Sequence, residues 1–372
     1  MAKKSKKNRI TDTQKLLLIA NLVFVAAILL SYLSPYVNPA TNSIPALFGL
    51  LYPAFFIINV LFFAFWVISQ KIYFIIPLIV IIIGYGMFLK NVGFNKEKLV
   101  GDYAGALKIV SYNVRLFDQY KATGNDTYFT RNAIFSFIKS EQADIVCFQE
   151  FFHGNEKYFP TIEPFVESQN AKNFHVDYTK TIGNHRHYGI ATFSVYPIVN
   201  RGTIHFENSN SNSGIFTDIL FKNDTLRIFN FHLESVRFSN ADYQFVSEFI
   251  DPEAHNQTSS KIIFWKLKNA FIRRAEQARV VAEYIKKSPY PVIVCGDFND
   301  TPSSYVYKTI SDNLKDTFIE TGQGIGSTYA GDLPFLRIDF ILHSPVLEAF
   351  KYKKNQISYS DHFPVSCYFK MK

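Results

Sequence analysis

The sequence predicts a chain of two parts, an apolar helical region at the N-terminus and a mixed α+β domain after it. Residues up to about Lys90 are almost all apolar, whereas residues from about Lys96 onward have the mixed composition of a globular domain. This second part combines short, strand-like apolar runs with a few helical patterns. With 372 residues, of which 48% are hydrophobic, the chain has room for both parts.

The apolar region contains three long uncharged stretches, at residues 16–33, 44–68 and 72–89. A helix of about 20 residues is needed to cross a bilayer. A cleaved signal peptide could resemble the first stretch, but no small-residue cleavage site follows it and two more stretches come after it. We therefore expect three transmembrane helices within residues 16–90. The alternatives are a buried helical hairpin and a single anchor.

The basic residues predict the orientation of these helices. The tail at residues 1–15 carries six basic residues against the single acid Asp12, and the loop at residues 34–43 has no charge. By the positive-inside rule the tail is cytoplasmic, so an odd number of spans places the C-terminal domain on the far side, the periplasm of a bacterium. The tail also supplies five of the eight net positive charges, so the basic pI does not indicate a nucleic-acid-binding face.

The C-terminal domain, residues 107–372, follows a short linker at residues 91–106. Two helices are expected there, at Arg131–Ser140 and Trp265–Lys287, and two loops, at Ile182–Tyr188 and Thr321–Leu333. Strands are expected at Ala106–Val114, Asp144–Glu150, Tyr188–Tyr196, Gly214–Phe221, Thr225–Leu233, Pro291–Asp297, Arg337–His343 and Phe363–Lys370.

Three cysteines, Cys147, Cys295 and Cys367, each lie inside one of these apolar runs. Their odd number and the absence of paired spacing argue against a disulfide framework. We expect them to behave as small buried hydrophobic residues.

Polar side chains stand where the predicted strands end. Each one alone is explained by a turn, a helix cap or a salt bridge. Their repetition at the ends of apolar runs predicts that they meet at one edge of a sheet. These residues are Asn113, Glu150, His232, Asp297, Asn299, Asp339, Asp361 and His362.

Seven motifs between Leu107 and Phe369 carry these residues: SYNVR, DIVCFQE, HYGIATFSVYPI, FNFHLES, GDFND, RIDFIL and SDHFPV. In this order they resemble the endonuclease/exonuclease/phosphatase superfamily, which includes pancreatic deoxyribonuclease, neutral sphingomyelinases and inositol polyphosphate 5-phosphatases. The resemblance implies a four-layer α/β sandwich of two packed mixed β-sheets flanked by helices. It also places the active site at one edge of the sandwich.

The resemblance implies a metal-dependent hydrolase. Hydrolysis of a phosphate ester needs a divalent cation to neutralise the phosphoryl oxygens. Hard oxygen ligands suit Mg²⁺ or Mn²⁺, which makes Glu150 the leading ligand, assisted by Asn113 and Asp361.

The same resemblance assigns the other roles. Asp297 would orient and deprotonate the attacking water, while Asn299 would hydrogen-bond the phosphate or the nucleophile. His232 and His362 would bind the non-bridging oxygens or act as acid and base, and Asp339 would orient a histidine or a ligand. His232 is typical of the deoxyribonuclease and sphingomyelinase branches, a position at which abasic-site repair nucleases differ.

Other residues near the motifs receive no catalytic role. Arg274 and Gln277 are interpreted as part of an exposed helix face, although an approach to the site is the alternative. No firm role is assigned to His185, Arg186 and His187.

Membrane spans beside a phosphoesterase predict a substrate at the membrane surface, so we expect a phosphodiesterase or phosphatase acting on a phospholipid, sphingolipid or related head group. The bilayer is the expected partner. Aromatic residues in the segment Phe238–Trp265, namely Tyr243, Phe245, Phe249 and Phe264, weakly favour lipid. One alternative is a nuclease of the cell envelope, which would need a basic groove with stacking aromatics. The other is a non-catalytic scaffold on the same fold.

Overall fold

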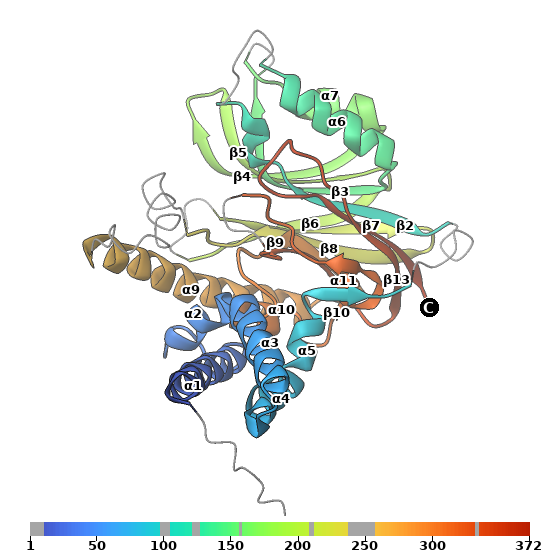
Figure 1. Ribbon diagram of the computed structural model, residues 1–372. Coiled ribbons are helices and arrows are strands. Elements are labelled where there is room, and N and C mark those ends of the chain that lie inside the picture. Colours follow the sequence, from blue (N-terminus) through green and yellow to red (C-terminus); the bar gives the residue numbers. More distant parts are fainter. Residues whose placement is uncertain are drawn as a thin grey trace, which may run out of the picture.

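The computed structural model describes residues 11–96, 105–120, 127–155, 158–207, 212–236, 257–331 and 335–372, with side chains of the long helix α9 described from residue 261. In the C-terminal domain, two β-sheets pack face to face between two layers of helices (Figure 1). Helices α6 (Phe129–Glu141) and α7 (Ile162–Gln169) cover one sheet. Helices α9 (Gln257–Lys286) and α10 (Tyr305–Ile310) cover the other.

Both sheets have six strands and mixed direction. In the first sheet, only the pair β2–β3 is parallel, and in the second sheet only β8–β9. The first sheet has the order β13 (Leu347–Lys354), β14 (Val365–Met371), β2 (Leu107–Asn113), β3 (Ile145–Gly154), β5 (Arg186–Ser194), β4 (Asn173–Ile182). The second has the order β10 (Lys315–Asp316), β12 (Asp339–His343), β9 (Val292–Asp297), β8 (Asp224–His232), β7 (Gly214–Phe221), β6 (Ile198–Ile204). The prediction of two packed mixed sheets flanked by helices is confirmed.

Three clusters of buried apolar residues fill the three interfaces between the four layers. Phe135 and Phe165 join α6 and α7 to the first sheet. Val294 meets α9 and α10 beneath the second sheet. The middle cluster lies between the sheets and contains Cys147, Cys295 and Cys367, which are buried and form no disulfide. Because a strand of the middle layers is covered on both faces, its sequence reads as a nearly continuous apolar run.

Each of the eight predicted strand segments contains a strand, but four further strands of the two six-stranded sheets, β4, β6, β10 and β13, were not predicted. All four are edge strands; β10 has only two residues, and in the other three exposed positions interrupt the apolar pattern. The loop expected at Ile182–Tyr188 is instead a tight turn, since β4 ends at Ile182 and β5 begins at Arg186. Gly183 in this turn has a φ of 58°, which favours glycine.

The expectation of three full-length transmembrane helices is wrong for the residues that the structure describes. Helix α1 (Asp12–Leu33) has 22 residues and is long and apolar enough to cross a bilayer. The second apolar stretch forms α2 (Ile44–Leu50) and α3 (Tyr52–Ile68), which meet at 67° and count as a span only if taken together. The third is divided into η1 (Ile72–Phe74), α4 (Ile75–Ile83) and α5 (Tyr85–Leu89).

The breaks have local causes that a hydropathy profile does not register. Pro45 and Pro53 lie in the first turns of α2 and α3, where proline starts a new helix rather than continuing the previous one. Gly84 separates α4 from α5. Hydropathy measures the apolar length of a segment, whereas a span also needs an unbroken helix.

The expected linker at residues 91–106 joins the two parts by strand pairing. Its strand β1 (Val92–Phe94) pairs antiparallel with β11 (Gln323–Ile325), which lies in the second loop predicted for this domain. Asn95 adds hydrogen bonds of 3.0 Å from Nδ2 to the carbonyl oxygens of Ile319 and Gly322. Residues 97–104 of the linker lie outside the described residues. The apolar region is therefore docked on the C-terminal domain, as Figure 1 shows.

A buried ion pair lies beneath this contact. The Arg337 guanidinium donates to both carboxylate oxygens of Asp316, at 3.1 and 2.8 Å, and both side chains are buried. The Tyr307 hydroxyl donates to the same carboxylate at 2.7 Å, and Asp316 also caps the helix α11 (Thr317–Thr321). The pair and its hydrogen bonds thus compensate two charges that are both withdrawn from solvent.

Replacement of Asp316 by alanine should leave the Arg337 charge buried without its partner. We expect the free energy of unfolding to fall by about 3–5 kcal/mol. Denaturant unfolding of the purified chain measures this change. Asp312→Ala removes the same charge at an exposed position and should change the free energy by less than about 0.5 kcal/mol. Equal losses in the two variants would contradict the importance of the ion pair.

Candidate active site

Strand register brings three of the predicted residues together. His232 ends β8, Asp297 ends β9 and Asp339 begins β12, and these strands are neighbours in the second sheet. The register pairs His232 with Asp297 and Asp297 with Asp339. Because directly paired residues point to the same face of a sheet, the three side chains lie side by side.

The carboxylate of Asp297 lies at the centre of the group and is fully buried. Its Oδ1 accepts the backbone N–H of Asn299 at 2.8 Å. Its Oδ2 accepts a hydrogen bond of 3.0 Å from Asn113 Nδ2, at the end of β2 in the first sheet. The Nε2 atoms of His232 and His362 lie 3.5 and 3.6 Å from the same oxygen. One carboxylate therefore contacts groups from both sheets.

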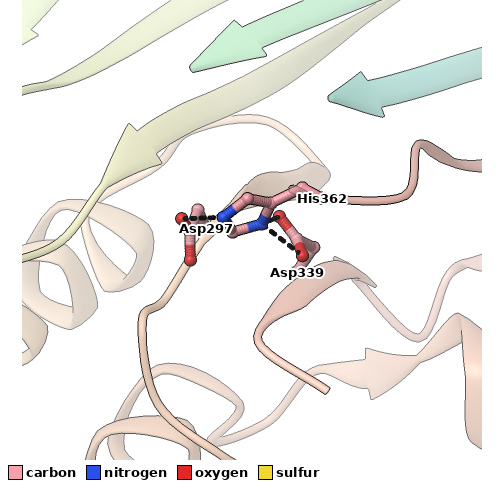
Figure 2. Close-up of side chains that lie close together, drawn as sticks. All are labelled: Asp297, Asp339 and His362. Carbon is pink, nitrogen blue, oxygen red and sulfur yellow. Dashed lines mark hydrogen bonds and ion pairs between the residues drawn. The ribbon is translucent and has the colours of Figure 1, made fainter. Parts of the chain in front are cut away.

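His362 is oriented by Asp339, as Figure 2 shows. Its Nδ1 lies 3.0 and 3.1 Å from the two carboxylate oxygens of Asp339, so its Nε2 is directed toward Asp297. Burial alone would lower the pKa of His362, but the Asp339 carboxylate, and after it that of Asp297, raise this pKa to about 10. The imidazole is therefore protonated at neutral pH and presents an N–H at Nε2.

Glu150 is placed by a β-bulge. Between Phe148 and Phe151, strand β3 has one residue more than its partner β5, and Glu150 adopts a φ of 48° there. Bulges redirect side chains and often occur beside active sites. Glu150 Oε1 lies 3.6 Å from His232 Nε2 and 3.4 Å from Asn113 Nδ2. Its side chain is 33% exposed, so Glu150 faces solvent at the edge where Asp297 is buried.

Glu150 and His232 line a cleft of about 440 Å³. The Nε2 atom of His232 is buried and has no hydrogen-bond partner within the described structure, so it can interact with a bound molecule. Lys180 is the sole lysine or arginine among the described residues that line the cleft. Other lining residues include Tyr120, Thr179, Tyr188, Asn212 and Ser235.

Two groups of side chains are close enough to be considered for a metal ion. The ligand atoms of Asp297, Asp339 and His362 lie within 4.8 Å of one another. In this group His362 Nδ1 and the Asp339 carboxylate already bond to each other. The Glu150 carboxylate is partly exposed and lines the cleft, so its oxygen atoms fit a hard divalent cation that binds there.

The other two predicted ligands are placed differently from expectation. Asn113 directs its Nδ2 toward the carboxylates, and its Oδ1 accepts the backbone N–H of Arg115 at 3.0 Å. In this arrangement Asn113 donates hydrogen bonds to Glu150 and Asp297, and its role as a metal ligand stays a prediction. Asp361 is partly exposed, and its Oδ2 lies 3.5 Å from Arg115 Nε.

Asn299 also has a structural contact where substrate binding was expected. Its Nδ2 donates to the carbonyl oxygen of Leu233 at 2.9 Å, and its φ is 51°. Together with the bond from its backbone N–H to Asp297, this contact fastens the end of β9 to the end of β8. The left-handed backbone is one that asparagine tolerates better than most residues.

A residue that sequence analysis missed supports Asp339. Thr328 is fully buried, and its Oγ1 accepts the backbone N–H groups of Ile338 and Asp339, both at 3.0 Å. The next residue, Tyr329, forms an isolated β-bridge with His362, and its ring lies edge-on to the imidazole at 5.4 Å. Both lie in the segment predicted as a loop, whose polar composition gave no indication of a buried role.

Arg274 and Gln277 are buried, so their interpretation as an exposed helix face is wrong. Arg274 Nη1 donates to the Glu234 carbonyl oxygen at 3.1 Å, and its Nε lies 3.3 Å from Asp300 Oδ2. Gln277 Oε1 accepts the Glu234 N–H at 2.8 Å. Helix α9 thus holds the chain two residues after His232. A helical apolar pattern cannot distinguish such buried polar residues from solvent-exposed ones.

A polar bridge joins the two sheets beneath the site. Gln149 Nε2 donates to Asn230 Oδ1 at 2.7 Å and to Ser111 Oγ at 3.1 Å. Asn230 Nδ2 donates in turn to the Ala191 carbonyl oxygen at 2.9 Å.

The remaining residues without an assigned role, His185, Arg186 and His187, lie at the turn between β4 and β5.

This architecture and site agree with a match to a known family. The model of the endonuclease/exonuclease/phosphatase family matches residues 110–362, more than half of the chain. The chain therefore belongs to the endonuclease/exonuclease/phosphatase family, whose members are hydrolases acting on phosphoester bonds. A second model, described as a domain of unknown function (DUF8431), matches residues 14–91, the apolar region. A search of curated proteins found no match.

Solved structures share the fold of the C-terminal domain. An endonuclease/exonuclease/phosphatase from Beutenbergia cavernae is 16% identical with a TM-score of 0.51, and the alignment covers 71% of each chain. The human Nocturnin catalytic domain with bound sulfate is 19% identical with a TM-score of 0.51, over 72% of this chain and 94% of that one. A family protein from Leptotrichia buccalis is 14% identical with a TM-score of 0.51, and the alignment covers 72% of this chain and 100% of that one. Identities this low establish a shared fold alone.

Replacement of Thr328 by valine should leave the N–H groups of Ile338 and Asp339 buried without an acceptor. Since an unsatisfied buried donor costs about 1–3 kcal/mol, we expect these amides to exchange with deuterium roughly tenfold faster or more. Hydrogen exchange followed by mass spectrometry on the peptide that contains both residues measures this. Thr328→Ser keeps the hydroxyl and should retain the protection; equal exchange in the two variants would contradict the role of Thr328.

Proposed function

We propose that this chain is a membrane-anchored, divalent-metal-dependent phosphodiesterase or phosphatase that hydrolyses a lipid-linked phosphate ester. The observation that carries the proposal is the convergence, at one edge of the sandwich and from both sheets, of a buried carboxylate, two histidines and a partly exposed carboxylate. These groups are Asp297, His232, His362 and Glu150. Phosphoester hydrolysis requires a base for water, donors for the phosphoryl oxygens and a cation site, and these four side chains supply all three.

The positions of the side chains suggest their roles. Asp297 would orient and deprotonate the attacking water through Oδ2, the oxygen that lies beside the Nε2 atoms of His232 and His362. His362 is held protonated by Asp339 and donates from Nε2 to a non-bridging phosphoryl oxygen. His232 lines the cleft, and its buried Nε2, which has no hydrogen-bond partner within the described structure, binds a second oxygen or protonates the leaving group.

The cation would be Mg²⁺ or Mn²⁺, held by Glu150 with Asp361 as a further proposed ligand. When bound, it would supply charge neutralisation of the phosphoryl oxygens. Asn113 and Asn299 fix the carboxylates rather than contact the phosphate in this proposal, because their amide groups already bond to protein atoms.

We further propose that α1 anchors the chain with the basic tail in the cytoplasm. Tyr36, just beyond the C-terminal end of α1, lies under the Lys308 ammonium at 5.3 Å. The catalytic domain thus contacts the end of α1 that is opposite Asp12 and the tail. With α1 spanning the membrane and the tail cytoplasmic, this contact favours a catalytic domain on the far side, the periplasm of a bacterium.

The cleft favours a lipid head group over nucleic acid. A nucleic acid needs a basic groove along its phosphates, and the described lining of the cleft offers Lys180 as its sole lysine or arginine. The non-catalytic scaffold is disfavoured because Glu150, His232, Asp297 and His362 are all chemically competent.

Purified chain reconstituted in vesicles should hydrolyse a soluble generic phosphoester in the presence of Mg²⁺. We expect EDTA to abolish turnover, and Glu150→Gln, Asp297→Asn and His362→Gln each to lower kcat by about 100-fold to 10,000-fold, since each removes a charge or a proton carrier from the reaction. Steady-state kinetics measures these values. Asp312→Asn, at the opposite end of the second sheet, is the matched control, and Mg²⁺-independent turnover would contradict the proposal.

Competition between substrate classes tests the choice of lipid. The wild-type chain, with Mg²⁺, is given sphingomyelin-like lipids and phosphorylated lipids in vesicles, inositol phosphates, and plasmid DNA. We expect the highest kcat/KM on a lipid because the described lining of the cleft offers Lys180 as its sole lysine or arginine, whereas a phosphate backbone requires several cations. Faster cleavage of plasmid DNA, with a steep dependence on salt, would instead establish the envelope nuclease.

A further inference from the structure

The two halves of α9 have different surroundings. After Ala270, Ala278 and Val281 are buried in the cluster that packs against the second sheet, and Phe271 and Ala275 are buried as well. Before Ala270, the helix extends beyond the sheet, as Figure 1 shows, and its apolar side chains are exposed: Ile262 by 47%, Phe264 by 39% and Trp265 by 54%. An amphipathic helix normally buries its apolar side chains against another surface. Because Ile262, Phe264 and Trp265 are exposed, no part of the described chain covers this half of α9.

Basic side chains accompany the exposed apolar ones. Lys261 is exposed, and the Lys268 ammonium lies 4.7 Å from the centre of the Trp265 ring. Tryptophan, phenylalanine and lysine together are typical of helices in the boundary between lipid head groups and acyl chains. The aromatic rings tolerate this boundary, and the ammonium groups pair with anionic phosphates.

The position of α9 agrees with this composition. Helix α9 contacts α2, and α2 follows the C-terminal end of α1 by ten residues. In Figure 1, α9 lies beside α2 and above α1, and its N-terminal half projects away from the sheets. It therefore lies at the level where the helix that is long enough to cross a bilayer would leave it.

We propose that residues 261–268 of α9 lie in the head-group layer of an anionic bilayer, with Phe264 and Trp265 inserted among the lipids. This inference rests on the proposed membrane anchor and specifies how the substrate reaches the site. The buried half of the same helix holds Glu234 through Arg274 and Gln277, two residues after His232. A rigid helix thus fixes the height of the cleft above the lipid surface, where a lipid-linked phosphate would enter.

Tryptophan fluorescence tests this placement without any activity assay. The chain has two tryptophans, and Trp66 is buried, so the difference between wild type and Trp265→Phe isolates the signal of Trp265. The full chain is reconstituted in vesicles of phosphatidylcholine and phosphatidylglycerol, with or without bromine near the head-group end of the acyl chains. We expect the emission of Trp265 to be blue-shifted and to be quenched by the brominated lipid. Acrylamide dissolved in the aqueous phase should not quench it.

A control tryptophan distinguishes lipid contact from general proximity to the vesicle. Phe174, 37% exposed on β4 of the first sheet, is replaced by tryptophan in the Trp265→Phe background. Its emission should be quenched by acrylamide and not by bromine. If Trp265 behaves as this control does, or if the chain fails to remain with the vesicles, the proposed placement is overturned.

Activity gives an independent readout. Phe264→Ser and Trp265→Ser change exposed residues and should leave turnover of a soluble phosphoester unchanged while lowering turnover of lipid in vesicles. Equal turnover of vesicle lipid by wild type and variants would overturn the placement. Loss of all turnover in the wild type would overturn the proposed enzyme, while the bromine quenching would still decide the position of α9.

Discussion

The carboxylate of Asp297 is the constraint on which the site depends. A buried charge is costly unless opposite charges or hydrogen-bond donors surround it. Hydrogen bonds come from the amide of Asn113 in the first sheet and from the backbone of Asn299, and two histidines lie at ion-pair distance. Two layers of the sandwich must therefore be in register before this charge is compensated, so the fold and the site stabilise each other.

The two central carboxylates differ in environment and so can differ in role. Asp297 is enclosed, whereas Glu150 is one-third exposed and is turned toward the cleft by a bulge. Beneath them, the hydrogen bond between Gln149 and Asn230 ties the sheets together through side chains that face neither solvent nor the cleft. Such a buried layer keeps the reacting groups in place, and preorganised groups need little rearrangement during a reaction.

The parts predicted from the sequence are those that obey a local rule. Buried strands such as β9 are apolar runs, and their polar tips, including Asp297, mark the catalytic edge. Edge strands were missed because solvent interrupts their pattern, and Thr328 and Arg274 were missed or misjudged because their partners are distant in sequence. The transmembrane count was too high because Pro53 and Gly84 break helices without lowering the hydropathy of their segments.

The pairing of β1 with β11 attaches the segment that directly follows the apolar region to the C-terminal domain. Strand β11 continues through Gly326, whose N–H donates to the Asn91 carbonyl oxygen at 2.9 Å, to Thr328 and Tyr329 beside His362. A chain cut after residue 96 to obtain a soluble enzyme would leave β11 with open backbone groups, a site for pairing with other copies. The same cut would release one end of the loop beside His362, so solubility and an intact candidate site could not be obtained by simple truncation.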